Sequence, residues 1–325
     1  MVETILDINN LSIQFKTPQG IFHAVENVSF SIEPGDILGI VGESGCGKSV
    51  TSLSLMGLLP DSAFVTADQM TFQDKDILSL NDKEKQQMRG KDMSMIFQEP
   101  MTSLNPLIRI GTQIAESARI HLGLNKQEAK ARSIDMLQKV GLSDAERLYR
   151  RYPHELSGGM RQRIMIAMAV ICAPKLLIAD EPTTALDVTI QAQILELMKN
   201  INKQDGTSVI FISHDLGVIK EICTKVLVMY AGQVVESASA EQLFQNSQHP
   251  YTQGLMASIP TPEKKNKPLY AIPGRVPSLT GRKAGCLFAP RCSRTAGDCR
   301  DMVPLLNRAD SNHLVSCFYP GRVED

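Results

Sequence analysis

Long apolar runs and an excess of charge of one sign are both missing from this 325-residue chain. No stretch of about 18 consecutive apolar residues occurs, so the sequence predicts no membrane-spanning helix, and any membrane role would depend on partner proteins. The first residues carry no basic segment followed by an apolar run, which argues against a signal peptide. The formal net charge of −1 provides no overall field that would attract nucleic acid or anionic lipid.

Cysteine is sparse over most of the chain and concentrated near its end. Cys46, Cys172 and Cys223 are scattered, whereas the other four of the seven cysteines lie within the last forty residues: Cys286, Cys292, Cys299 and Cys317. Because no export signal is present, such a group indicates metal ligands more readily than disulfides. The length allows one large core and a second, small domain.

Short apolar runs bounded by turn residues predict buried strands, and helical patterns lie between them. The strands are expected at 38–41, 176–179, 209–212 and 226–229, and the helices at 48–58, 158–171, 188–203 and 215–222. Strands that alternate with helices predict an α/β fold with a mostly parallel sheet covered on both faces.

Three other regions differ from this alternation. Residues 110–150 lack strand character and predict an inserted helical subdomain. Residues 5–15 and 24–32 predict two strands of an antiparallel flap, joined by a turn at 17–20. From residue 260 to residue 277, five prolines punctuate a polar stretch that is typical of a linker.

A glycine-rich segment between a predicted strand and a predicted helix fits the pattern G-x-x-x-x-G-K-[ST]. Glycines let the backbone curl so that several N–H groups point at one phosphate, and the following helix directs its positive end there. The Lys48 ammonium would reach the β- and γ-phosphates, and the Ser49 hydroxyl would bind Mg²⁺. The sequence therefore predicts an ATP and Mg²⁺ site at Gly42, Glu43, Ser44, Gly45, Cys46, Gly47, Lys48 and Ser49.

Two carboxylates and a histidine follow other predicted strands. The strand at 176–179 ends in Asp180, which we expect to hold Mg²⁺ through water, and in Glu181, which would polarise an attacking water. His214 ends the strand at 209–212. Because the carboxyl ends of parallel strands lie along one edge of a sheet, where ligands bind, we expect His214 near the γ-phosphate.

A second glycine-bearing segment resembles the signature sequence of ABC proteins, normally LSGGQ: Leu156-Ser157-Gly158-Gly159-Met160-Arg161-Gln162-Arg163. Ser157 can cap a helix that begins at the two glycines, whose N–H groups could grip a phosphate. In the ABC family this segment binds the ATP of the opposite subunit, so the resemblance implies a head-to-tail pair with two ATPs at the interface. Met160 stands where Gln is commoner, and a thioether cannot replace the hydrogen bonds of an amide.

The remaining ABC elements follow in order, and the resemblance covers about residues 1–260. Gln98 matches the glutamine loop, which contributes a Mg²⁺ ligand and links the core to a helical subdomain at about 100–170. Asp187 matches the D-loop, which crosses the dimer interface, and Phe15 matches the aromatic residue that stacks on adenine. The resemblance implies an ATPase with Glu181, His214 and Gln98 as its catalytic residues. The presence of Lys48, Asp180, Glu181 and His214 argues against a regulator that binds ATP without turnover.

Several stretches narrow the resemblance to peptide-importer ATPases. They are 97–106 (Phe-Gln-Glu-Pro-Met-Thr-Ser-Leu-Asn-Pro), 249–252 and 273–277. The implied function is to power import of di- or oligopeptides, with a nickel or other solute importer of the same family as the alternative. A soluble ATPase of the DNA-repair type is a further alternative. Such proteins usually insert coiled coils or zinc modules between phosphate loop and signature, and only about 110 residues without heptads separate them here.

The resemblance also implies partners and a location. The partners are a second, different ABC ATPase subunit, two integral membrane permease subunits and an extracytoplasmic peptide-binding protein, with no nucleic acid. The location is peripheral, on the cytoplasmic face of the inner membrane. Residues 101–106, with the apolar Met101, Leu104 and the adjacent Leu107, are expected to border the permease contact.

The four late cysteines are expected to form the core of a small Cys-rich domain at 261–325. Structural zinc sites favour C-x₂₋₄-C pairs, and the spacings of 5, 6 and 17 residues contain none. Iron–sulfur clusters accept thiolates from irregular loops. The cysteine tail resembles that of the D-type subunits of peptide importers, which implies a [4Fe–4S] cluster on Cys286, Cys292, Cys299 and Cys317. Zn²⁺, disulfides or free thiols remain as alternatives.

Overall fold

The computed structural model describes residues 4–18, 20–98, 103–184, 186–260, 270–277, 279–280, 284–310 and 312–321. The chain forms two compact units. The helical unit contains residues 33–35 and 78–211, with the first residues of the chain, and the flap unit contains 6–32, 36–77 and 212–325. Among the described residues no helix combines the length and the apolar character needed to cross a membrane.

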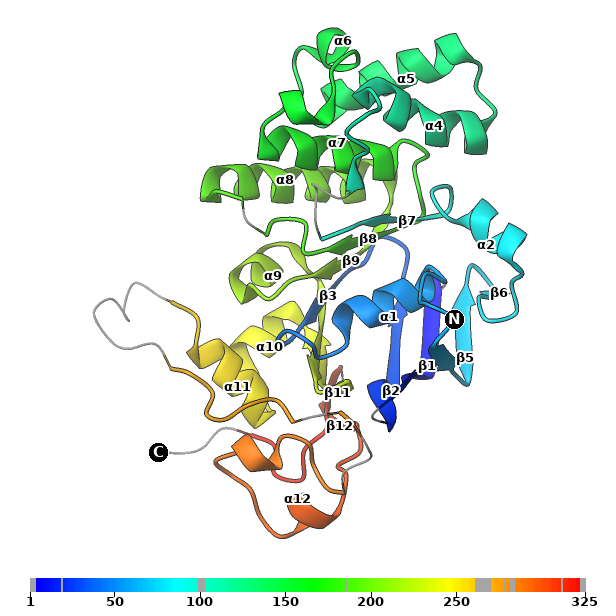
Figure 1. Ribbon diagram of the computed structural model, residues 1–325. Helices are drawn as coiled ribbons and strands as arrows, with labels where there is room; N and C mark the ends of the chain where they lie inside the picture. The colour runs from blue at the N-terminus through cyan, green and yellow to red at the C-terminus, as the bar shows by residue number, and fades with distance from the viewer. Residues whose placement is uncertain are drawn as a thin grey trace. The chain divides into compact units, whose positions relative to one another are not determined.

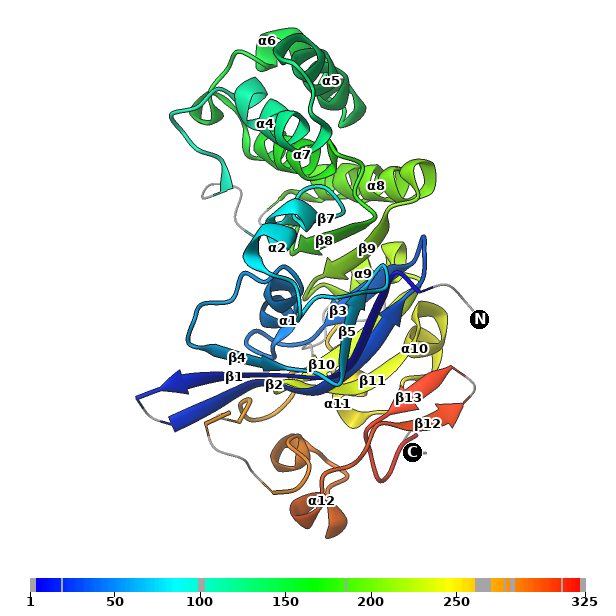
Figure 2. The ribbon, with the colours of Figure 1, turned by 90° about the vertical axis from the view of Figure 1, so that its right-hand side faces the viewer.

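The flap unit begins with an antiparallel sheet in the order β2-β1-β5-β6, with β4 also paired to β1 (Figure 2). In β1 every inward side chain of its first half is fully buried, because apolar and polar residues alternate there with the period of a strand. This sheet confirms the predicted flap, although Gln19 of the predicted turn lies outside the described residues. The strands are β1 (Leu6–Thr17), β2 (Gly20–Ile32), β4 (Ala63–Thr66), β5 (Gln69–Phe72) and β6 (Lys75–Asp76).

The flap unit also contains strands in the order β12-β13-β11-β10-β3. The fully buried β3 (Ile37–Val41) is parallel to β10 (Lys225–Tyr230), whereas β11 (Gln233–Ser239) is antiparallel to β10. The C-terminal β13 (His313–Val315) adds to β11, and β12 (Asn307–Asp310) adds to β13. The helices of this unit are α1 (Lys48–Leu55), α9 (Leu216–Ile222), α10 (Ala240–Asn246), α11 (Pro250–Ala257), η3 (Ala289–Arg291) and α12 (Asp298–Asp301).

The helical unit combines a buried parallel pair, β7 (Met93–Ile96) and β8 (Leu176–Asp180), with a group of packed helices (Figure 1). The strand β9 (Ser208–Ile212) neighbours β8. The helices are α2 (Asp82–Met88), α4 (Ile110–Leu122), α5 (Lys126–Lys139), α6 (Ala145–Leu148), η1 (Pro153–Glu155), α7 (Gly158–Val170) and α8 (Val188–Asp205). They confirm the helical subdomain expected at 110–150.

The predicted strands and helices of the α/β core are confirmed within two or three residues at each end. The sheet is mixed, however, where a mostly parallel one was expected. The antiparallel part arises because β11 follows β10 after a two-residue turn, and because β13, which comes from the far C-terminal part of the chain, pairs with β11. Short apolar runs cannot reveal such a partner, since strand pairing is set by contacts distant in sequence.

Candidate active site

The phosphate loop lies between the buried strand β3 and helix α1, as the sequence predicts. Two of its glycines allow the chain to turn where no side chain fits. A Cβ on Gly42 (φ +155°) would lie 2.2 Å from the Met229 carbonyl oxygen, and one on Gly47 (φ +101°) would lie 2.7 Å from the Ala24 carbonyl oxygen. The loop is therefore a cradle of main-chain N–H groups held against neighbouring backbone, which fits a bound phosphate chain.

The Lys48 side chain lies folded over this loop. The residue is 6% exposed, and its Nζ donates to the carbonyl oxygens of Gly42 (2.7 Å) and Glu43 (3.1 Å). Its ammonium group is thus already held at the cradle, where it can exchange carbonyl contacts for phosphate oxygens. Cys46 is buried against it, with Sγ 3.7 Å from Nζ, and burial raises the pKa of its thiol. Ser49 is half-buried in the first turn of α1.

Two other predicted residues belong to the flap unit. His214 is exposed, directly after the buried Ser213, and Asp215 then caps helix α9 by accepting the Gly217 N–H at 2.8 Å. Phe15 lies in β1 with a half-buried side chain, opposite Phe22 of β2. Nothing in the described contacts assigns His214 or Phe15 to a ligand, so both roles stay predictions.

In the helical unit, the structure brings together two of the predicted catalytic residues. Asp180, at the end of β8, is 5% exposed. Glu181 follows at φ +48°, a left-handed conformation that costs a side-chain-bearing residue about 1–2 kcal/mol. Its Oε2 accepts hydrogen bonds from Gln98 Nε2 (3.2 Å) and from Thr184 Oγ1 (2.9 Å). Backbone strain and two donors therefore hold the carboxylate in one orientation.

Sequence reasoning missed Thr184, although its spacing of three residues from Glu181 was visible. A hydroxyl three residues further along a turn can fold back onto the first side chain. Asp187 caps α8 by accepting the Ile190 N–H at 2.9 Å. Ala185, in the predicted D-loop, lies outside the described residues.

The signature segment forms the start of α7. The Ser157 hydroxyl accepts the Met160 N–H at 3.4 Å, which confirms the predicted cap. Ser157 and Gly158 are exposed, and a Cβ on Gly158 would meet nothing within 4 Å. Gly159 is half-buried, and a Cβ on it would lie 3.0 Å from Ile190, so only the start of α7, at Ser157 and Gly158, is open at the surface of the helical unit.

The stretch expected to border the permease contains both buried and exposed apolar residues. Leu104 is 2% exposed and therefore belongs to the core, so its use as a contact residue was wrong. Leu107 is instead 85% exposed and Ile108 is 40% exposed. The Asn105 N–H donates to the buried Gln113 side chain at 2.9 Å, which turns the chain and directs neighbouring apolar residues to opposite sides. Met101 lies outside the described residues.

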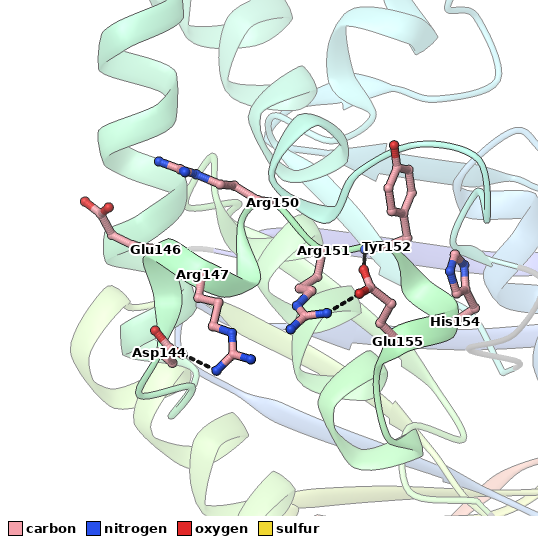
Figure 3. A pocket seen from close by; sticks show the side chains of 8 residues that line it. All are labelled: Asp144, Glu146, Arg147, Arg150, Arg151, Tyr152, His154 and Glu155. Carbon is pink, nitrogen blue, oxygen red and sulfur yellow. Dashed lines mark hydrogen bonds and ion pairs between the residues drawn. The ribbon is translucent and has the colours of Figure 1, made fainter.

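A hollow lined by charged side chains lies on the helical unit, and none of the predicted site residues lines it (Figure 3). It precedes the signature segment and holds the ion pairs Arg151–Glu155 and Arg147–Asp144. Its side chains are those of Asp144, Glu146, Arg147, Arg150, Arg151, Tyr152, His154 and Glu155. Since most of them are exposed or half-buried, the hollow is a solvated charged surface.

The four late cysteines line a single narrow cavity in the flap unit. None forms a disulfide, and burial raises the pKa of the Cys286 and Cys317 thiols. Backbone N–H groups donate to two of the sulfurs, from Arg294 to Cys292 Sγ (3.3 Å) and from Tyr319 to Cys317 Sγ (3.4 Å). Within the described ranges, no three His, Cys, Asp or Glu side chains are close enough to hold one metal ion.

Comparisons with known proteins decide the family. Residues 25–184 match the model described as "ABC transporter", and residues 235–299 match "Oligopeptide/dipeptide transporter, C-terminal region". The chain is 49% identical to the oligopeptide transport ATP-binding protein AppD of Bacillus subtilis, over 98% of this chain and 97% of that one. The chain belongs to the ABC transporter ATP-binding proteins.

Two further relatives support the same assignment. The dipeptide transport ATP-binding protein DppD of Escherichia coli is 45% identical, over 97% of each chain. Among solved structures, the ATP-binding cassette MJ0796, a dimer bound to ADP and phosphate, matches 72% of this chain and 98% of its own, with a TM-score of 0.65 and 25% identity. As a member of this family, the chain binds ATP and is an ATPase.

Proposed function

We propose that this ABC ATPase powers the import of di- or oligopeptides through a membrane transporter. The observation that supports the proposal most strongly is the match of residues 235–299 to the C-terminal region of oligopeptide and dipeptide transporters. This region lies outside the general ATPase match, so it carries information on the type of transporter. The names of the relatives AppD and DppD, which are similar over nearly their whole length, point to the same cargo.

The ATP site follows from the residues already described. The N–H groups of the loop 42–49 would bind the β- and γ-phosphates, and Lys48 would turn from the loop carbonyls onto them. Ser49, Asp180 and Gln98 would hold Mg²⁺, directly or through water, and the ion would neutralise charge on the phosphates. Phe15 would stack on adenine, a contact worth about 1–3 kcal/mol.

Glu181 would act as the general base for the attacking water. Its Oε2 accepts bonds from Gln98 and Thr184, which orient the carboxylate at the end of β8. A movement of the segment that carries Gln98 would therefore change the hydrogen bonding of the Glu181 carboxylate. His214 would contact the γ-phosphate, in keeping with its exposed position at the end of a buried strand.

Assembly would complete the site. The first turn of α7, with the exposed Ser157 and Gly158 and the half-buried Gly159 and Met160, would bind the ATP held by a second and different ABC subunit, and Asp187 would lie near that interface. The two subunits would act on two integral membrane permease subunits, at the cytoplasmic face of the inner membrane. An extracytoplasmic peptide-binding protein would deliver the cargo. Closure around two ATPs and reopening after hydrolysis would then drive alternating access.

The cargo can be tested with the complete transporter in proteoliposomes. We expect ATPase activity to rise severalfold when the binding protein carries a di- or tripeptide, and labelled peptide to accumulate only with ATP. Stimulation by Ni²⁺ and not by peptides would identify the alternative importer of the same family. Stimulation by DNA without permease subunits would instead identify the DNA-repair alternative.

For the four cysteines we propose a [4Fe–4S] cluster with a structural or redox-sensing role. The proposal is supported by their position around one cavity, by the absence of disulfides between them and by the N–H groups directed at two sulfurs. The test is anaerobic purification with iron and sulfide analysis and a visible spectrum. About four irons per chain are expected. One zinc per chain, or a colourless metal-free protein, would contradict the cluster.

A further inference from the structure

Glu43, the second residue of the phosphate loop, is held at all three of its polar groups. Its N–H donates to the Tyr251 hydroxyl at 2.9 Å, and its carbonyl oxygen accepts from Lys48 Nζ at 3.1 Å. Its carboxylate accepts two bonds from the Arg291 guanidinium, Nη1 to Oε2 at 2.6 Å and Nη2 to Oε1 at 3.0 Å. The last contact spans 248 positions in the chain, so a residue beside the cysteine-lined cavity directly holds the phosphate loop.

Arg291 is itself firmly placed, with a side chain that is only 4% exposed. Its Nε donates to the Pro273 carbonyl oxygen at 2.8 Å. Its guanidinium carbon lies 5.7 Å from the centre of the Tyr230 ring and 6.0 Å from that of Phe288. Hydrogen bonding to Glu43 raises the pKa of Arg291 above its ordinary value, so its guanidinium stays charged. Because the planar guanidinium donates two hydrogen bonds to the Glu43 carboxylate, it fixes the plane of the carboxylate as well as its position.

The negative charge of Glu43 indicates why its ion pair with Arg291 matters for ATP binding. A carboxylate in a loop that receives a triphosphate repels its ligand, and the cost is larger in a partly buried site than in water. Arg291 offsets that charge and also anchors the residue between Gly42 and the loop's other glycines. These glycines have no side chains with which to fix their own orientation. The anchor therefore determines how the N–H groups of a flexible loop are directed.

We propose that Arg291 is a positioning residue for ATP binding, which orients the phosphate loop through its bidentate ion pair with Glu43. The C-terminal segment thereby becomes part of the nucleotide site, although no atom of Arg291 need touch the nucleotide. A change in the segment around Arg291 would be transmitted to the loop through this pair. The proposal depends only on ATP binding by the chain and not on the cargo or on a metal cluster.

The two possible roles of Glu43, repelling phosphate or anchoring the loop, predict opposite effects of Glu43→Ala on the affinity for ATP. If Glu43 only repelled phosphate, its removal would strengthen ATP binding. If it anchors the loop, its removal weakens ATP binding, and we expect about a tenfold loss, within the range of couplings between linked sites. Arg291→Ala should cause a similar loss. The double variant should be within about twofold of either single variant, because both remove the same contact.

The experiment titrates the purified full-length chain with a fluorescent ATP analogue and Mg²⁺, and records thermal unfolding of every variant. Arg291→Lys keeps the charge but loses the fork, so it should give an intermediate affinity. Arg308→Ala removes an exposed arginine of the same C-terminal segment and should bind like the parent. In the complete transporter, the substitutions should raise KM for ATP about tenfold and change kcat by less than threefold.

Arg291→Lys and Glu43→Ala keep the test decisive if Arg291→Ala does not fold, since Arg291→Lys retains the buried positive charge and the Glu43 side chain is 31% exposed. Parental or tighter ATP binding by Glu43→Ala would overturn the proposal. Losses that multiply in the double variant would also overturn it, because they would show that Arg291 and Glu43 act independently.

Discussion

The conservative replacement Glu181→Gln tests the central step of the proposed mechanism. Glutamine has the size of glutamate, and its amide oxygen can accept the same two bonds from Gln98 Nε2 and Thr184 Oγ1. The loop after β8 should therefore keep its geometry, and only the base is lost. We expect ATP to bind within about threefold of the parental affinity, because no phosphate contact is assigned to Glu181.

The expected loss of turnover follows from the role of a general base. Such a base contributes about 10²–10⁴-fold to a rate, which corresponds to about 3–5.5 kcal/mol of transition-state stabilisation. A smaller loss would mean that water is oriented by other groups. The variant should also accumulate as a closed pair with ATP bound, since reopening follows hydrolysis.

The assay is phosphate release by the complete transporter in proteoliposomes, with nucleotide binding measured on the same preparation. Glu146→Gln is a matched control, because Glu146 is an exposed carboxylate on α6 of the same unit and loses the same charge. If Glu181→Gln hydrolysed ATP at near the parental rate while Glu146→Gln behaved like the parent, the assignment of the base would be refuted.

Three further predictions address assembly, coupling and stability. The isolated chain should hydrolyse ATP at less than about a hundredth of the rate of the transporter, because the start of α7, at Ser157 and Gly158, is open at the surface of the helical unit; full activity of a monomer, verified by light scattering, would contradict this. Leu107→Asp should impair peptide uptake more than nucleotide binding, whereas Leu305→Asp, at a residue that is 73% exposed in the C-terminal segment, should not; unchanged uptake would remove Leu107 from the contact. Glu236→Ala should lower the free energy of unfolding by about 3–5 kcal/mol, because its fully buried carboxylate accepts two backbone N–H groups and faces an imidazole nitrogen. Chemical denaturation checks it, and the exposed Glu241→Ala should cost less than about 1 kcal/mol.

The stretch predicted to border the permease illustrates what a local pattern leaves open. Leu104 and Leu107 are both apolar residues of one loop, and sequence alone offers no reason to separate them. The structure buries Leu104 and exposes Leu107, because Gln113 accepts the Asn105 N–H and donates to the carbonyl oxygens of Asn105 and Ile108. Sequence could therefore name a stretch expected at a partner surface, but it could not tell which of its side chains are exposed.

The sequence by itself determined the features that depend on neighbours along the chain. The phosphate loop, the cap at Ser157 and the carboxylate after β8 each require particular residues at short spacings, because one turn of backbone carries out each task. The tertiary structure alone decided which distant residues meet: Gln98 with Glu181, the four cysteines around one cavity, and Arg291 with Glu43. Such contacts depend on how strands and helices pack, and no short-range pattern records that packing.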